Sequence, residues 1–363
     1  MANGLEDVIA AETVLSDVDG LAGRLVIRGM PLNAIAGHWR YEEVLYLLFS
    51  GFFDDLPPAT EFAAVLASAR SEVFALLTPI DPAVAALPAY DAMRALIARL
   101  PDGTDLASAL QLVAAPSVIL PALIRLASGQ QPVAPGKNLG HAADILQMMS
   151  GTPADPARVA ALDTYLVTVA DHGLNASTFA ARVVASTQAG LMSSVLAALG
   201  ALKGPLHGGA PGPVLDMLDA VGTPENAASW IATELARGER LMGFGHRIYR
   251  VRDPRADALS VALDRLRKVG QSDAARMTLA ASVEITALAA LKRHKPDRPL
   301  ATNVEFYTAL LLEALGFPRE TFTSVFAIGR TGGWLAHARE QALTGKLIRP
   351  KSQYVGPVPK QAA

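Results

Sequence analysis

Residues 204–213 read GPLHGGAPGP, the densest cluster of glycine and proline in a chain of 363 residues. Glycine and proline interrupt regular secondary structure, so this cluster indicates a boundary between structural units rather than the interior of an element. A second candidate boundary is Gly316-Phe317-Pro318. The segment between the two boundaries is rich in charged residues, and the pattern is consistent with a smaller domain inserted into a larger one.

Helical periodicity dominates the sequence on both sides of the cluster. After Asp155-Pro156, an N-cap residue followed by a first-turn proline, apolar residues recur at three- and four-residue steps over residues 157–170. Strand-like segments are confined to residues 12–28, around Asp19-Gly20. We therefore predict an all-α fold with one small β element near the N-terminus. Further helical patterns cover Tyr41–Phe49, Glu61–Leu77, Tyr90–Leu100, Ala227–Leu235, Asp257–Arg267, Met277–Lys292, Val304–Leu315 and Gly333–Leu343.

Composition argues against several classes of protein. Lys and Arg number 32 against 34 Asp and Glu, so the net charge is −2 and no nucleic-acid partner is expected. The absence of cysteine removes disulfides, thiolate nucleophiles and Cys-ligated zinc. No metal site is predicted, because no H-E-x-x-H motif is present. Gly243-Phe244-Gly245 does not read as a nucleotide-binding loop, because position 248 is Ile248 and no strand precedes it.

Two apolar stretches, Leu106–Leu123 and Val183–Leu202, are long enough to raise the question of membrane spans. The first contains two prolines, and the second is interrupted by serine, threonine and glutamine. Because 51% of the chain is hydrophobic and only 18% is charged, we interpret both as helices buried in the core or in a subunit interface. The first Lys or Arg is Arg24, so no signal peptide is recognised, and a cytoplasmic protein without a membrane partner is expected.

Three histidines, His172, His207 and His246, each lie next to a glycine. Glycine lets a ligand or another backbone approach closely, which suits an active site. A single histidine of this kind is more often a hydrogen-bonded structural residue than a catalytic one. The presence of all three favours an active site.

With their neighbours, these histidines resemble the motifs of the citrate synthase family, which includes the 2-methylcitrate synthases. The resemblance runs over nearly the whole chain. It implies an almost all-α homodimer with a two-domain, multi-helical fold. Residues 1–211 and 318–363 would form a large domain for dimerisation, and residues 212–317 a small domain that binds CoA and closes over the substrates. The densest matching stretches are HGLNAST at 172–178, GPLHGGA at 204–210, MGFGHR at 242–247, DPR at 253–255, NVEFY at 303–307 and GRT at 329–331.

The resemblance also implies a reaction. Enzymes of this family condense oxaloacetate with an acyl-CoA and then hydrolyse the thioester. The expected substrates are oxaloacetate and acetyl-CoA, with propionyl-CoA, the 2-methylcitrate synthase substrate, as the alternative, and no permanently bound cofactor is expected. Removing the α-proton of a thioester requires a positioned base and stabilisation of the enolate oxygen at the same time.

The catalytic roles follow from the resemblance, residue by residue. His207 would donate to the thioester oxygen as the enol forms, and His246 would hydrogen-bond and protonate the ketone of oxaloacetate. Glu305 occupies the position of the general base. We expect His207 to be neutral, because a helix that begins near Pro213 would place positive potential beside it.

The binding roles fall on histidine, arginine and glycine. By resemblance, the residues that contact substrate carboxylates or carbonyls are His172, Arg255, Arg330 and Arg349, the last reaching into the site of the partner subunit. A planar guanidinium suits this role, because it binds a carboxylate through two parallel hydrogen bonds. For each arginine the alternative is an ordinary solvated surface charge. The CoA contacts would come from Arg250, Gly243 and Gly245.

Glu305 departs from the family pattern, which has aspartate at this position. One extra methylene moves the carboxylate by about 1 Å or more, and a displacement of that size can cost on the order of 100-fold in rate. Two alternatives therefore stay open: Glu305 forms a capping box with Thr302, or the protein is a catalytically impaired homologue that binds CoA or dicarboxylates. Gly173 and Pro211-Gly212 depart as well, where relatives often carry Glu and Asn-Glu.

Overall fold

The computed structural model describes residues 8–208, 211–245, 248–249, 251–296 and 300–357. Helices dominate these residues, and the strands are few and short. The predicted all-α fold is confirmed.

The strands form the small N-terminal element that the sequence predicts. Strands β1 (Ser16–Asp19), β2 (Arg24–Ile27) and β3 (Met30–Pro31) make an antiparallel sheet in the order β1-β2-β3. Val18 pairs with Leu25 across the first hairpin. The Asp19 carboxylate accepts hydrogen bonds from the backbone N–H groups of residues 21 and 22, at 3.0 and 2.9 Å, and this closes the turn.

The helices of the chain ends make up most of the molecule. They are α1 (Leu32–Ile35), α2 (Tyr41–Phe49), α3 (Ala59–Leu77), α4 (Pro82–Ala85), α5 (Ala89–Ile97), α6 (Leu106–Ala127), α7 (His141–Ser150), α8 (Pro156–Val169), α9 (Ala176–Ala185), α10 (Leu191–Leu202) and α16 (Phe322–Thr344), with a 3-10 turn at Arg319–Thr321.

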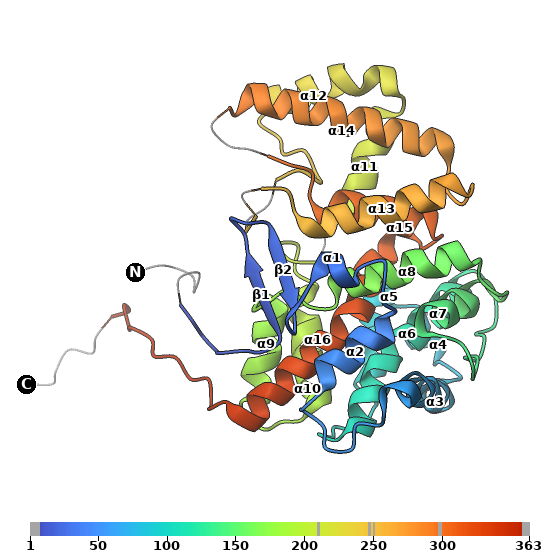
Figure 1. Cartoon of the computed structure of the whole chain (residues 1–363), viewed down its shortest axis with the longest axis vertical. Helices are drawn as coiled ribbons and strands as arrows, with labels where there is room; N and C mark the ends of the chain where they lie inside the picture. Colours follow the sequence, from blue (N-terminus) through green and yellow to red (C-terminus); the bar gives the residue numbers. More distant parts are fainter. Residues whose placement is uncertain (1–7, 209–210, 246–247, 250, 297–299, 358–363) are drawn as a thin grey trace, which may run out of the picture.

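A second group of helices comes from the middle of the chain. It consists of α11 (Pro211–Val221), α12 (Ala227–Ala236), α13 (Pro254–Lys268), α14 (Ala274–His294) and α15 (Val304–Ala314), with a 3-10 turn at Pro224–Asn226. Figure 1 shows α12 and α14 at one end of the molecule, with α13 between them and the main helical body. The domain boundaries at residues 212 and 317 stay a prediction.

Local sequence signals explain several helix starts. At α8, Asp155 caps the helix by accepting from the Ala157 N–H at 2.8 Å, and Pro156 takes the first helical position. At α15, Asn303 is the N-cap residue and accepts from the Glu305 N–H at 3.1 Å. Both helices then bury an apolar face in the core.

Helix α16 is the centre of the larger group. It packs against α9, α10, α6, α8 and α2, and its Trp334 is fully buried. Glycines allow this close packing. A Cβ on Gly333 would collide with the carbonyl oxygen of Ala170, and one on Gly329 would collide with Val169.

The two long apolar stretches have different outcomes. Leu106–Leu123 lies within α6, and 78% of the most apolar window of that helix is buried in the protein. The second stretch covers the end of α9 and the whole of α10. The two helices are separate, and Gly190, at φ 99°, directly precedes α10. Among the described residues, α14 is the other helix that is long and apolar enough to span a membrane, with 28% of its window buried. It carries Arg276 and Glu284, which bond to Glu313 and to Thr302 respectively.

Candidate active site

One cavity of about 370 Å³ gathers most of the residues that the sequence selects. His172, His207, Arg255, Glu305 and Arg330 all line it, although they come from five separate segments of the chain. A concave pocket with several converging polar groups is the expected form of a small-molecule site.

His207 lies in the turn between α10 and α11. Its Nε2 atom is 2.7 Å from the hydroxyl of Ser177, the second residue of α9. Trp334 donates its indole N–H to the same hydroxyl at 3.1 Å. A Cβ on Gly208 would collide with the Leu202 carbonyl oxygen, so this glycine lets the His207 turn fold back on α10. Ser177 and Trp334 therefore fix the orientation of the imidazole.

The His207 imidazole is neutral at neutral pH. Burial, together with the smaller effect of the nearby Arg330 charge, lowers its pKa to about 4. The predicted charge state is right, but its main causes are burial and Arg330 rather than a helix terminus. A neutral imidazole can hydrogen-bond a developing enolate oxygen without first giving up a proton.

Glu305 is the second residue of α15, and its carboxylate faces the cavity. Its Oε2 atom is buried without a hydrogen-bond partner among the described residues. Burial raises the pKa of Glu305, while the Arg255 charge opposes that rise. A desolvated carboxylate with an unused oxygen is suited to accept a proton.

The capping alternative for Glu305 is wrong. The N-cap residue of α15 is Asn303, and the Thr302 hydroxyl donates instead to Glu284 at 2.6 Å. Asn303 also ties this helix start to the glycine loop, because its side-chain amide donates to the Gly245 carbonyl oxygen at 2.9 Å. The carboxylate of Glu305 is thus left available to the cavity.

Arg255 is the second residue of α13, and its guanidinium is paired with the Asp253 carboxylate without any substrate. Its Nη2 and Nε atoms lie 2.8 and 3.1 Å from the two oxygens of Asp253. Burial alone would lower the pKa of Arg255, but the Asp253 charge raises it above its ordinary value. The guanidinium is therefore positioned by a carboxylate of its own chain.

Arg330 is also buried, yet no carboxylate lies within ion-pair distance of it among the described residues. Its Nε donates to the Val169 carbonyl oxygen at 2.5 Å, and its guanidinium lies 4.8 Å from the centre of the Phe326 ring. Burial lowers the pKa of Arg330 to about 10; Asp171 opposes this shift and Arg255 adds to it. Two cations that repel each other across one cavity form an anion site.

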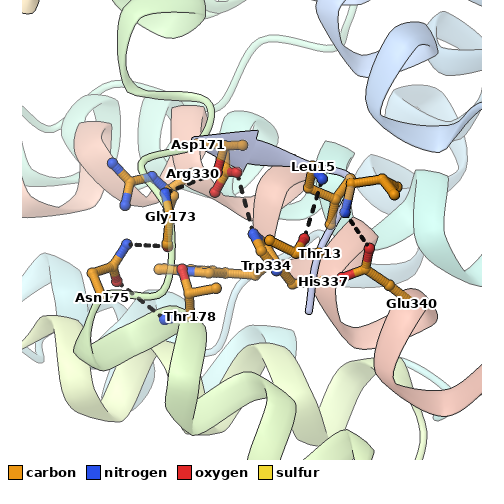
Figure 2. A network of polar contacts seen from close by, with 12 residues as sticks. Thr13, Leu15, Asp171, Gly173, Asn175, Thr178, Arg330, Trp334, His337 and Glu340 are labelled. Carbon is orange, nitrogen blue, oxygen red and sulfur yellow. Dashed lines mark hydrogen bonds and ion pairs between the residues drawn. The ribbon is translucent and has the colours of Figure 1, made fainter. Parts of the chain in front are cut away.

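His172 follows α8 in a loop that a buried polar network supports. The Nε2 atom of His337 lies 3.2 Å from Asp171, and its Nδ1 atom lies 2.9 Å from Arg182. Arg182 in turn pairs with Glu340 at 2.5 Å. Figure 2 shows Asp171, Gly173 and Asn175 on this loop, close to Arg330 and Trp334 of α16.

Several predicted site residues are not placed in the cavity. His246 and Arg250 lie outside the described residues. Gly245 lines the cavity, whereas Gly243 packs against Phe306 with φ at 85°. Arg349 is exposed on the C-terminal segment, which Figure 1 shows leaving the helical body. Among the described residues, no group of three His, Asp or Glu side chains could hold a metal ion.

Ser177, Trp334 and Tyr249 belong to the hydrogen-bond network of the site, although none of them was predicted from the sequence to have a role. Ser177 lies inside the HGLNAST stretch and could have been found there, because a hydroxyl near a catalytic histidine is a natural hydrogen-bond partner. No sequence signal links Trp334 to this serine, 157 positions away in the chain.

Comparisons with known proteins find matches over nearly the whole chain. The family model described as "Citrate synthase, C-terminal domain" matches residues 4–351. The "Putative citrate synthase 2" of Mycobacterium tuberculosis is 39% identical over 98% of this chain and 93% of its own length. The "2-methylcitrate synthase" of the same organism is 35% identical over 97% of this chain and 90% of its own length.

A solved structure shows the same fold with ligands. It is the citrate synthase of Thermoplasma acidophilum in a ternary complex with carboxymethyl coenzyme A and oxaloacetate. It is 28% identical to this chain, covers 100% of this chain and 98% of its own, and has a TM-score of 0.85.

Proposed function

The chain belongs to the citrate synthase family, and we propose that it condenses oxaloacetate with an acyl-CoA and hydrolyses the resulting thioester. It is an enzyme of the acyltransferase type. The observation that carries the proposal is one cavity in which a neutral imidazole, a buried carboxylate with one unpartnered oxygen and two buried guanidinium groups meet.

In the proposed mechanism, Glu305 removes a proton from the carbon next to the thioester carbonyl. His207 donates a hydrogen bond to the thioester oxygen and stabilises the enol that forms. The enol carbon attacks the ketone carbon of oxaloacetate, whose oxygen takes a proton from His246. Water then cleaves the thioester and releases CoA with its thiol proton. The unused Oε2 atom of Glu305 supports its part in the first step.

The ketoacid would lie between the two arginines. Arg255 and Arg330 would each bind a carboxylate of oxaloacetate, and His172 would contact a carboxylate or carbonyl oxygen. Burial is the main cause of the lowered pKa of Arg330, and the Arg255 charge adds to it; this supports the role, because a bound dianion would favour the charged form of both arginines.

The acyl-CoA is acetyl-CoA first and propionyl-CoA second in this proposal. The two substrates differ by one methylene, and a hydrophobic pocket discriminates such a difference by about 10- to 200-fold. Relatives named for each reaction cover nearly the whole chain. Arg250, Gly243 and Gly245 are proposed to contact CoA.

A homodimer would complete the site. Arg349 lies on an exposed segment that leaves the helical body, and this supports the proposal that it reaches the site of a second copy. The same segment exposes Leu347, Tyr354 and Val355, at 58%, 72% and 88%, and apolar side chains of this size are commonly covered by a partner. We place this dimer in the cytoplasm, acting on small molecules without nucleic acid or membrane partners.

A thiol-release assay tests the function. Purified protein with oxaloacetate and either acetyl-CoA or propionyl-CoA should release free CoA, and release should stop when oxaloacetate is omitted. Absence of CoA release with both thioesters, although calorimetry shows that they bind, would overturn the proposal. The comparisons do not support a catalytically impaired binding homologue, since relatives named as enzymes cover nearly the whole chain.

A further inference from the structure

Tyr249 contacts two of the residues assigned to the ketoacid. Its hydroxyl oxygen lies 3.0 Å from His172 Nε2, and the two rings meet edge to face with centroids 5.7 Å apart. The Arg255 guanidinium lies over the same phenol ring, 5.8 Å from its centre. Tyr249 is only 3% exposed and is not among the cavity-lining residues. It therefore supports the site from behind.

We propose that Tyr249 is a positioning residue that holds His172 and Arg255 at a fixed separation for the ketoacid, and that the turn at residues 19–23 keeps Tyr249 in place. The proposal rests on the proposed function, because it concerns the same cavity. It adds a residue and a supporting element that the family resemblance does not supply.

The chemistry of Tyr249 suits a passive support. Burial raises the pKa of the hydroxyl above its ordinary value, and the Arg255 charge opposes that rise only in part. The group therefore stays neutral over the working pH range and remains a hydrogen-bond partner for the imidazole. The phenol ring, in addition, offers its π-face to the Arg255 cation.

The turn between β1 and β2 packs closely against the backbone next to Tyr249. A Cβ on Gly20 would collide with the carbonyl oxygen of Ile248. At Gly23, with φ at 64°, a Cβ would come within 2.7 Å of Val251 Cγ2. Only glycine permits this approach, so the two glycines let the turn pack closely against Ile248 and Val251, on either side of Tyr249 in the sequence.

The same hairpin also holds the His172 loop. The Gly173 N–H donates to the Ser16 hydroxyl at 3.0 Å, and Gly173, at φ 62°, packs against Val18. One small sheet thus contacts both segments, the one that carries Tyr249 and the one that carries His172. A rigid support of this kind keeps two binding groups in the geometry that the ligand needs.

Tyr249→Phe tests the hydroxyl alone, because it keeps the ring and its contact with Arg255. We expect the KM for oxaloacetate to rise about 10-fold, the value for one lost hydrogen bond, with the KM for acyl-CoA changed less than about twofold. Calorimetry with oxaloacetate alone should show the same loss of affinity. The matched control is Tyr90→Phe, which removes a buried hydroxyl bond to the Leu199 carbonyl oxygen; neither residue lines the cavity, so both KM values should stay unchanged.

Gly20→Ala tests the turn. The added methyl group must displace the Ile248 backbone, so we expect the same selective rise in the oxaloacetate KM in a protein that still unfolds cooperatively. Unchanged oxaloacetate affinity in both Tyr249→Phe and Gly20→Ala, with an active parent enzyme, would overturn the inference. Failure of the proposed function looks different, because the parent protein would then release no CoA at all.

Discussion

Two buried arginines of this protein differ in how their positive charge is compensated. Arg70, fully buried between α3 and α7, pairs with Asp144 at 2.5 Å and donates to the Leu139 carbonyl oxygen at 2.7 Å. Arg330, equally buried, has a backbone carbonyl and an aromatic ring as neighbours and is repelled by Arg255. The first charge is compensated by a carboxylate of the fold, whereas the second has no carboxylate within ion-pair distance among the described residues and is proposed to bind the ketoacid.

This difference separates structural from functional polar groups. A buried charge costs several kcal/mol unless it is paired, so a buried charge without a paired carboxylate is a candidate for ligand binding. The same contrast holds for carboxylates. Asp144 is fully bonded, while Glu305 keeps one oxygen without a partner.

The largest expected effect comes from removing the free carboxylate. Glu305→Gln keeps the shape of the side chain but cannot take up a proton, and we expect kcat to fall about 1,000-fold with the oxaloacetate KM nearly unchanged. The thiol-release assay measures both. Equal turnover in the variant would show that Glu305 is not the base.

Substitution of the two arginines should change different properties, stability for Arg70 and substrate binding for Arg330. Arg70→Gln leaves Asp144 buried without its cation, and we expect the free energy of unfolding to fall by about 3–5 kcal/mol in urea titrations. Arg330→Gln should change stability little and raise the oxaloacetate KM about 100-fold, because it removes a charged hydrogen-bond donor to the substrate. Two variants with the same profile would erase the contrast.

Asp163 is another buried carboxyl group, and its titration should make the stability of the protein depend on pH. It accepts from the Tyr41 N–H at 3.0 Å, and burial raises its pKa to about 7, with Glu42 adding to the rise. Because this pKa exceeds the unfolded value of about 3.9, stability should fall as pH rises from about 4 to about 7.

Asp163→Asn removes that titration while it can keep the bond from Tyr41. The difference in free energy of unfolding between the variant and the parent protein should therefore rise, in favour of the variant, by about 4 kcal/mol between pH 4 and pH 8. Denaturant titrations at both pH values measure it. Parallel pH profiles for the two proteins would contradict the assignment of this group.

The smallest effect concerns the support of His207. Ser177→Ala removes the hydroxyl that holds the imidazole, and we expect kcat to fall about 10-fold, the value of one hydrogen bond. The control is Ser117→Ala in α6, a buried serine whose hydroxyl bonds the Ala114 carbonyl oxygen. A loss of kcat in the control alone would contradict the orienting role.

Most of the fold could be predicted from local pattern, and its main error is instructive. The predicted helix at 333–343 is only the second half of α16, which begins at Phe322. Its first half contains Gly329-Arg330-Thr331-Gly332, a composition typical of a loop. Those glycines lie against α8 and α2, where a larger residue would not fit, so close packing outweighs helix propensity there.

Most of the candidate site could also be selected from the sequence, since five of its side chains line one cavity. Their motifs are short and local, which is why they can be read from the chain. Arg349 could not be placed by this chain alone, because its proposed site belongs to a second copy.

The sequence by itself determined the helical class, helix starts such as the Asp155-Pro156 cap of α8, and the set of residues proposed to carry the chemistry, because each depends on neighbours within a few positions. Tertiary structure alone decided that His207 is neutral through burial and Arg330, that Arg255 is held by Asp253, and that Tyr249 bonds to His172. Burial and charge proximity join residues up to 123 positions apart in these cases, and only packing sets such distances.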